Sequence, residues 1–178
     1  MHEQKIILIT GPSAAGKSTL AALVALNSSW RSVSEDLAWD STGFAFDRGD
    51  PNHGVGKERH ERVRALVMES VKEHLAASCN VVVDFLMYQN PPVPVLDYIA
   101  SCNALGVRLK TVVLRPALEA IIERDHLRGR PEPPNLAALK FQHECYQASE
   151  LDALTVVDSS SLTPQETFDR YLRGFVVG

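Results

Sequence analysis

The chain contains the stretch Lys5-Ile6-Ile7-Leu8-Ile9-Thr10-Gly11-Pro12-Ser13-Ala14-Ala15-Gly16-Lys17-Ser18, which runs from an apolar segment into a glycine-bounded turn. The apolar half predicts a buried strand. The second half matches G-x-x-x-x-G-K-[ST], a motif in which glycines let several backbone N–H groups converge on one anion. A segment of helical periodicity follows, and a helix N-terminus adds partial positive charge at that point. The stretch therefore predicts a strand, a phosphate-binding loop and a helix, in that order.

The rest of the chain alternates strand-length apolar runs with helix-length amphipathic segments. The predicted strands are Lys5–Thr10, Trp30–Ser34, Asn80–Asp84, Val107–Leu114 and Ala153–Val157. The predicted helices are Lys17–Leu26, Lys57–Ala77, Pro91–Ala104, Pro116–Arg128, Asn135–Ala148 and Thr163–Phe175, with a loop at Asp47–Gly56. This alternation is typical of an α/β fold whose parallel sheet has helices on both faces and binds ligands at the carboxyl ends of its strands. No linker divides residues 1–178, so we expect a single domain.

The composition narrows the class of protein. The 178 residues include 18 basic and 22 acidic side chains, a net charge of −4, which argues against a protein that coats nucleic acid. No apolar run approaches the roughly 18 residues of a membrane span. The cysteines Cys79, Cys102 and Cys145 are scattered and form no C-x-x-C pair, so we expect neither a disulfide framework nor a zinc site. We expect a cytoplasmic protein that does not associate with a membrane.

Three residues around the glycine-bounded turn have the chemistry to hold a nucleoside triphosphate and its metal ion. In this motif Lys17 reaches the β- and γ-phosphates of ATP, and Ser18 supplies a hydroxyl ligand to Mg²⁺. Asp84 ends the apolar run at 81–83, and an acid delivered by a buried strand is the usual second contact on the metal side. The alternative for Asp84 is a carboxylate that caps the strand end. The pattern predicts ATP and Mg²⁺ as cofactors, with Gly11–Thr19 around the phosphates.

A cluster of arginines lies further along the chain, around Gly129. Arg124 and Arg128 are four residues apart and share a helix face, and Arg130 begins a proline-rich break. Planar guanidinium groups stabilise the negative charge that spreads over a transferred phosphoryl group. The cluster therefore predicts an arginine-rich lid at about residues 125–135. The alternative is a solvated basic helix end that complements the helix dipole.

Acidic residues directly follow the second predicted strand. Glu35 and Asp36 stand there, and a carboxylate at this edge can take the proton from an attacking hydroxyl group. The same residues fit a helix start with Ser34 as N-cap, so Asp36 is either a general base or part of a cap. Residues 35–78 would then form the acceptor-binding insert. Four aromatic residues in and near it could wall an acceptor or belong to the core: Trp39, Phe44, Phe46 and Tyr88.

These motifs, in this order, resemble the small P-loop kinases of the nucleoside-monophosphate-kinase-like class. The similarity is to the branch of zeta toxins, chloramphenicol phosphotransferases and polynucleotide kinases, an ATP-binding AAA-type family. The similarity rests on six segments, namely Gly11–Thr19, Ser34–Leu37, Val81–Phe85, Leu114–Pro116, Arg124–Arg130 and Val156–Ser160.

The resemblance implies a P-loop NTPase fold, a three-layer α/β/α arrangement with a five-stranded parallel sheet in the order 2-3-1-4-5. It implies ATP with Mg²⁺, transfer of the γ-phosphate to a hydroxyl group, and Asp36 as the general base. It also implies that Arg124, Arg128 and Arg130 bind phosphates or cover the adenine. Asp158 and Ser159, in the loop after the last strand, would lie near the adenine.

One departure from the family pattern bears on the acceptor. Polynucleotide kinases carry an arginine three residues after the base, and this chain has Trp39 there. Together with the acidic balance, this argues against a nucleic-acid partner. The leading interpretation is a kinase for a small-molecule hydroxyl acceptor, acting as a monomer or homodimer. The alternatives are a nucleotide or polynucleotide kinase, and a nucleotide-binding regulatory ATPase module.

Overall fold

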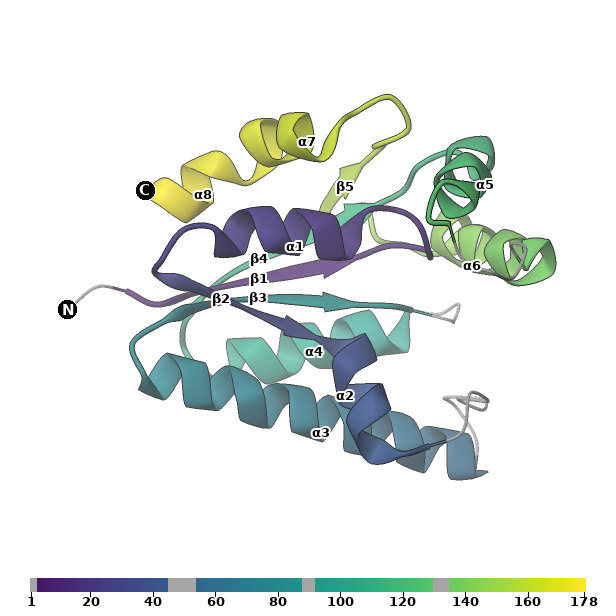
Figure 1. Cartoon of the computed structure of the whole chain (residues 1–178). Coiled ribbons are helices and arrows are strands. Elements are labelled where there is room, and N and C mark those ends of the chain that lie inside the picture. The colour runs from purple at the N-terminus through teal and green to yellow at the C-terminus, as the bar shows by residue number, and fades with distance from the viewer. Residues whose placement is uncertain (1–2, 45–53, 88–91, 130–134) are drawn as a thin grey trace.

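The computed structural model describes residues 3–44, 54–87, 92–129 and 135–178. At its centre lies a parallel sheet of five strands in the order β2-β3-β1-β4-β5 (Figure 1). The strands are β1 (Lys5–Thr10), β2 (Trp30–Ser34), β3 (Asn80–Phe85), β4 (Arg108–Leu114) and β5 (Thr155–Val157). The predicted sheet type and strand order are confirmed.

The central strands are buried because they are apolar along their whole length. β1 lies between β3 and β4, with Ile6 opposite Val81 on one side and Leu109 on the other. Every residue of β1 is buried, as a strand covered on both faces requires. All five carboxyl ends lie at one edge of the sheet, and the phosphate loop follows β1 at that edge.

Two layers of helices cover the sheet. The helices are α1 (Lys17–Ala25), α2 (Glu35–Thr42), α3 (Gly54–Ala76), α4 (Val93–Asn103), α5 (Leu118–His126), α6 (Leu136–Ala148), α7 (Pro164–Tyr171) and α8 (Arg173–Val177). Figure 1 shows α1, α7 and α8 on one face and α3 and α4 on the other. Helices α5 and α6 lie beyond the carboxyl edge, beside the phosphate loop.

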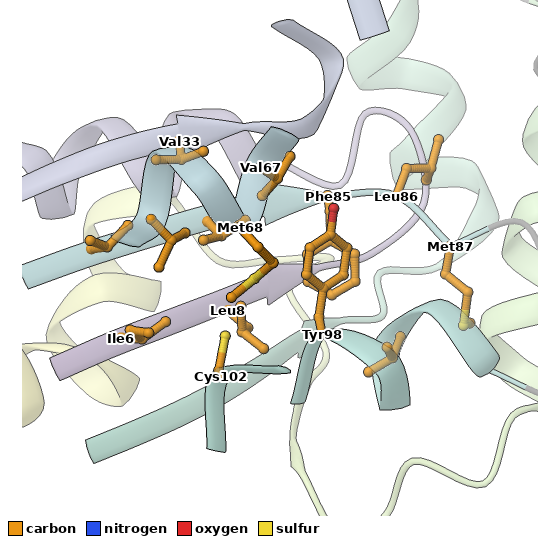
Figure 2. Close-up of a cluster of buried hydrophobic side chains, with 14 of the residues drawn as sticks. Ile6, Leu8, Val33, Val67, Met68, Phe85, Leu86, Met87, Tyr98 and Cys102 are labelled. Atoms are coloured by element: carbon orange, nitrogen blue, oxygen red, sulfur yellow. The ribbon is translucent and has the colours of Figure 1, made fainter. Parts of the chain in front are cut away.

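Alternate residues of the strands supply two separate apolar cores. Leu8, Val67, Phe85 and Tyr98 belong to the core under α3 and α4, where the rings of Phe85 and Tyr98 lie 4.4 Å apart (Figure 2). The other core packs β-strand residues against α1 and the C-terminal helices. In the described part of the chain, no helix is long and apolar enough to cross a membrane.

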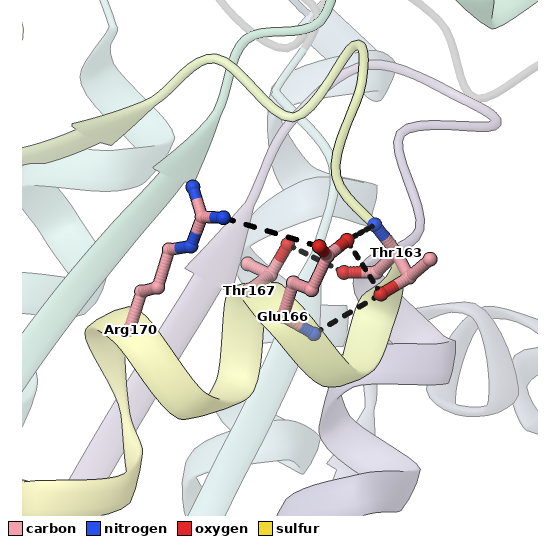
Figure 3. Close-up of polar contacts among 4 residues, drawn as sticks. All are labelled: Thr163, Glu166, Thr167 and Arg170. Carbon is pink, nitrogen blue, oxygen red and sulfur yellow. Dashed lines mark hydrogen bonds and ion pairs between the residues drawn. The ribbon is translucent and has the colours of Figure 1, made fainter.

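The start of α7 is fixed by a capping box. The side chain of Thr163 accepts a hydrogen bond from the backbone N–H of Glu166, and the Glu166 carboxylate accepts one from the backbone N–H of Thr163 (Figure 3). This reciprocal pair satisfies backbone donors that the first turn of a helix leaves unpaired. It anchors the loop that runs from β5 to α7.

Two local predictions are wrong. The predicted loop Asp47–Gly56 is too long, because Gly54–Gly56 opens α3. The predicted helix Thr163–Phe175 is two helices, because Leu172, with φ of −120°, interrupts it. Cys79, just before β3, is half-exposed.

Candidate active site

The phosphate loop is shaped by a close approach and two unusual backbone conformations. A Cβ at Gly11 would stand 2.6 Å from the carbonyl oxygen of Leu114, so only glycine fits between β1 and β4 there. Gly16 has φ of 97° and Ala14 φ of 60°, both in the left-handed region. The loop therefore curls back before α1, as an anion-binding nest requires.

Lys17 is the first residue of α1 and lies inside the curl of the loop. Its Nζ donates a hydrogen bond to the carbonyl oxygen of Pro12, 3.0 Å away. Burial lowers the pKa of Lys17 from 10.5 to about 8, while the carboxylates of Asp36 and Asp84 raise it. The cation is thus influenced by acids from two different elements, α2 and β3.

Ser18 and Asp84 meet across the edge of the sheet. The Ser18 hydroxyl donates to Oδ2 of Asp84 at 2.7 Å. Burial raises the pKa of Asp84, and the hydrogen bond from Ser18 and the charge of Lys17 act in the opposite direction. The structure brings the two predicted metal ligands together.

These two groups fit Mg²⁺. Both are hard oxygen donors, and a cation beside them would offset the burial of the Asp84 charge. Among the described residues, no group of three His, Cys, Asp or Glu side chains could hold a metal ion by itself. Mg²⁺ usually keeps waters and binds through one or two protein oxygens plus substrate phosphates, so a two-residue site suits it.

A cavity of about 340 Å³ adjoins the phosphate loop. Three segments line it, namely the loop with the start of α1, helix α5, and the β5–α7 connection. The lining residues are Ala14, Ala15, Gly16, Thr19, Leu20, Leu114, Arg124, Arg128, Ser159, Leu162, Pro164 and Thr167. A largely apolar chamber open to an anion-binding loop suits a nucleobase joined to phosphates.

Arg124 ties helix α5 to the loop after β5. Its Nη2 donates to the carbonyl oxygens of Ser159 and Ser160, at 2.6 and 3.1 Å. Arg128 lies one turn further on, also on the cavity wall, where it is 3.5 Å from the carboxylate of Asp125. Arg124 and Arg128 therefore share a helix face, as predicted. Arg124 itself contacts the backbone of the loop after β5, which was predicted to lie near the adenine.

The two predicted residues of the β5–α7 loop have different surroundings. Asp158 is exposed, and hydrogen bonds from the side chain and backbone of Ser160 lower its pKa. Ser159 is buried at the cavity wall, and its Oγ has no hydrogen-bond partner in the described structure. A buried hydroxyl without a partner at a cavity wall is a natural contact for a ligand.

In the predicted acceptor-binding insert, Asp36 and Glu35 lie in opposite environments. Asp36 is exposed in the first turn of α2, and its charge acts on Lys17. Glu35 is buried; it accepts hydrogen bonds from the backbone N–H of Leu86 at 3.1 Å and from the Tyr98 hydroxyl at 3.0 Å. Ser34 is the N-cap residue of α2, but its side chain makes no capping bond. Of the two acids, Asp36 is therefore the one that reaches the surface.

The aromatic residues of this side pack as core. Trp39 is buried, with its ring 4.8 Å from that of His60 and 6.0 Å from that of Phe44. The guanidinium of Arg59 lies over the Phe44 ring at 5.5 Å. These contacts fasten α2 to α3. The predicted residues Phe46, Tyr88 and Arg130 lie outside the described residues.

Sequence reasoning missed two residues of α6. Oε1 of Gln142 accepts a hydrogen bond of 2.9 Å from the backbone N–H of Ser13 in the phosphate loop. The Tyr146 hydroxyl accepts one of 2.8 Å from the N–H of Met87 and shares one of 2.6 Å with the Thr10 hydroxyl. The i,i+4 spacing of two polar side chains on the buried face of an amphipathic helix was the available signal.

Comparison with known proteins gives the same family. The sequence pattern of the AAA-domain family matches residues 6–148. None of the curated proteins matches the chain at a significant level.

Several solved structures are similar to this one. A chain of the Pnkp1/Rnl/Hen1 RNA repair complex is 18% identical with a TM-score of 0.62, over 83% of this chain and only 45% of its own length. The tunicamycin resistance protein of Deinococcus radiodurans is 16% identical, with a TM-score of 0.67 over 93% of this chain and 92% of its own. A gluconokinase from Sinorhizobium meliloti 1021 is 18% identical, with a TM-score of 0.61 over 93% and 88%. At these identities the likeness is one of fold.

Proposed function

The chain belongs to the AAA-domain family and has the fold of the small P-loop kinases, and on that premise we propose that it moves the γ-phosphate of ATP to a hydroxyl group of a small molecule. The observation that carries the proposal is that the charges of two acids act on the Lys17 cation of the phosphate loop. One acid is Asp84, bonded to Ser18, and the other is the exposed Asp36 in the first turn of α2.

The donor would bind along the phosphate loop. Its base would occupy the 340 Å³ cavity beside Arg124 and Ser159, and its phosphates would lie against the N-terminus of α1 and Lys17. Ser18 and Asp84 would hold Mg²⁺, which neutralises charge on the phosphates. A small acceptor suits this chain because α2 and α3 alone supply the described part of the acceptor side.

Asp36 would accept the proton of the attacking hydroxyl. A base must stand within hydrogen-bond reach of the acceptor, and the first turn of α2 offers an exposed carboxylate on the acceptor side of Lys17. Arg128, on the cavity wall, would stabilise the charge that develops on the transferred group. Arg124 holds the β5–α7 loop and would reach the nucleotide from that position.

The test compares Asp36→Asn with wild type in an ATP-consumption assay against sugars, nucleosides, aminoglycosides and phenicols. We expect acceptor-stimulated turnover in the wild type, and its loss by roughly 10²–10⁴-fold in Asp36→Asn with ATP affinity retained. Asp40→Asn, one turn further along α2, is the matched control and should keep the activity. Full activity of Asp36→Asn would remove the base assignment.

The same assay separates the other candidate functions. A polynucleotide kinase would bind oligonucleotides with an affinity that falls steeply with salt. A regulatory ATPase module would hydrolyse ATP at the same rate with and without every acceptor. Either result would replace the proposed function.

A further inference from the structure

Two successive backbone amides after β3 are held from opposite sides of the site. The N–H of Leu86 donates to Glu35, which belongs to the acceptor side, at 3.1 Å. The N–H of Met87 donates to Tyr146 of α6, which belongs to the donor side, at 2.8 Å. Figure 2 shows Leu86 and Met87 running on from Phe85 at the end of the strand. We call residues 86–87 the β3 exit.

On the donor side the bonds continue to the phosphate loop. Tyr146 is fully buried, and its hydroxyl also meets that of Thr10, the residue before Gly11. Gln142, one turn earlier on α6, accepts the N–H of Ser13. One helix face therefore holds both the loop and the β3 exit.

On the acceptor side the bonds continue to the start of α2. Glu35 is 6% exposed and has its second oxygen on the hydroxyl of Tyr98, which is 1% exposed. Tyr98 comes from α4 and packs against Phe85. Because Glu35 is the first residue of α2, its carboxylate fixes the turn that carries Asp36.

We propose that Glu35 and Tyr146 are positioning residues that set the acceptor base and the phosphate loop relative to each other by holding the β3 exit between them. This inference rests on the proposed function, in which Asp36 serves the acceptor and the loop holds the donor. Neither residue touches the reacting atoms.

Phosphoryl transfer requires the acceptor base and the phosphate loop to be held in a fixed relative position. An in-line transfer depends on the placement of acceptor and donor, and a shift of about 1 Å can cost on the order of 10²-fold in rate. Asp36 follows β2 and the phosphate loop follows β1, so the separation of the two depends on the groups that connect the ends of these strands. A buried polar group that loses its partner is left unsatisfied at a cost in free energy, so these buried hydrogen bonds resist breaking.

The first arm of the test measures amide hydrogen exchange in the nucleotide-free protein. Tyr146→Phe removes the hydroxyl and keeps the ring. We expect faster exchange at Met87, at Leu86 and in the first turn of α2. Ser149→Ala is the matched control, since it removes a buried hydroxyl bond from the end of the same helix, where Oγ donates to the carbonyl oxygen of Cys145. Faster exchange at Met87 and in the adjacent part of α6 alone, with no change in the first turn of α2, would overturn the proposal.

The second arm measures transfer with the best acceptor of the panel. Tyr146→Phe and Glu35→Gln should each lower kcat for transfer by roughly tenfold or more, with more ATP hydrolysed per acceptor phosphorylated. The double variant should lose less than the product of the two single losses, because both act on one segment. Glu35→Gln leaves one acceptor oxygen for two donors, the N–H of Leu86 and the Tyr98 hydroxyl, and serves if Tyr146→Phe does not fold.

The outcomes of the two arms are separable. Variants that are less stable but keep wild-type kcat and coupling of hydrolysis to transfer would show a structural role only, and would overturn the proposal. A wild type that phosphorylates no acceptor would overturn the proposed function. In that case the exchange arm still decides whether Glu35 and Tyr146 are linked through the β3 exit.

Discussion

At the scale of single residues, the two adjacent acids Glu35 and Asp36 have different environments. Glu35 and Asp36 are adjacent, but one carboxylate is buried under two hydrogen bonds and the other is exposed. Successive helical residues differ by about 100° in direction, so the first turn of α2 sends one acid inward and one outward. The pair of acids was predictable as a candidate site. Which of the two is buried depends on Leu86 and Tyr98, which come from distant parts of the chain.

Ser159→Ala tests the donor cavity at this scale. Its Oγ is buried without a partner in the described structure, so its removal should leave the free energy of unfolding nearly unchanged. We expect ATP affinity to fall by about 0.5–1.5 kcal/mol, the net value of one hydrogen bond. Isothermal titration of nucleotide, with the exposed Ser161→Ala as control, measures the difference. Equal ATP affinity in both variants would remove Ser159 from the nucleotide site.

At the scale of elements, apolar patterning fixed most of the boundaries. The buried run at 81–83 and the β1 run could only be strands covered on both faces, and the structure has them so. Composition misled at Gly54–Gly56, because glycine lowers helix propensity but tertiary packing of α3 overrides it. The break at Leu172 left no such mark in the sequence, since that residue is buried between α7 and α8 and a helical pattern continues through it.

The capping box of α7 predicts a dependence of stability on pH. The bonds to the backbone and side chain of Thr163 lower the pKa of Glu166 from 4.5. Because the folded-state pKa lies below the unfolded-state value, the carboxylate stabilises the fold above pH 4.5, and this stabilisation is lost as pH falls through the folded-state pKa. The melting temperature of Glu166→Gln should therefore lie below that of wild type at neutral pH and match it in acid.

The exposed Glu150→Gln is the control for that comparison. Thr163→Ala should destabilise the protein at neutral pH by about 0.5–2 kcal/mol, as loss of an N-cap does. A deficit of Glu166→Gln that stays constant down to strong acid would contradict the assigned role of the carboxylate.

At the scale of the molecule, the sheet brings segments from the whole chain to one edge. The phosphate loop follows β1 and Asp36 follows β2. Asp84 lies near the carboxyl end of β3, and Ser159 follows β5. The strand order places β2, β3 and β1 side by side, with β5 beyond β4, and all of their carboxyl ends lie at one edge. For this reason motifs far apart in sequence could be assigned to that edge before the structure. The contacts of α6 could not be assigned to the site in this way, because α6 contacts the loop through side chains whose pattern in the sequence is that of an ordinary core.

Cysteine reactivity reports on the whole fold. Burial raises the pKa of Cys102 to about 12, and the thiolate is the reactive form, so Cys102 should resist a thiol reagent while the protein is folded. The half-exposed Cys79 should react first. ATP with Mg²⁺ at about 100 times its Kd adds about 2.7 kcal/mol to stability, so labelling of Cys102 through unfolding should slow roughly 100-fold.

Cys79→Ser removes the fast reaction, and mass spectrometry of the labelled peptides follows Cys102 separately from Cys145. Labelling of Cys102 that is fast in the folded protein would contradict its burial. A slow reaction that ATP does not change would argue against nucleotide binding to the native state.

The most direct test of the central claim follows the γ-phosphate itself. The protein is incubated with Mg²⁺ and ATP whose γ-phosphoryl oxygens carry ¹⁸O, together with the panel of hydroxyl compounds, and the products are identified by mass spectrometry. The proposed function predicts an ¹⁸O-labelled phosphoryl group on one class of small acceptor, absent with Asp36→Asn. Label that appears only in inorganic phosphate, at a rate that no acceptor changes, would contradict it.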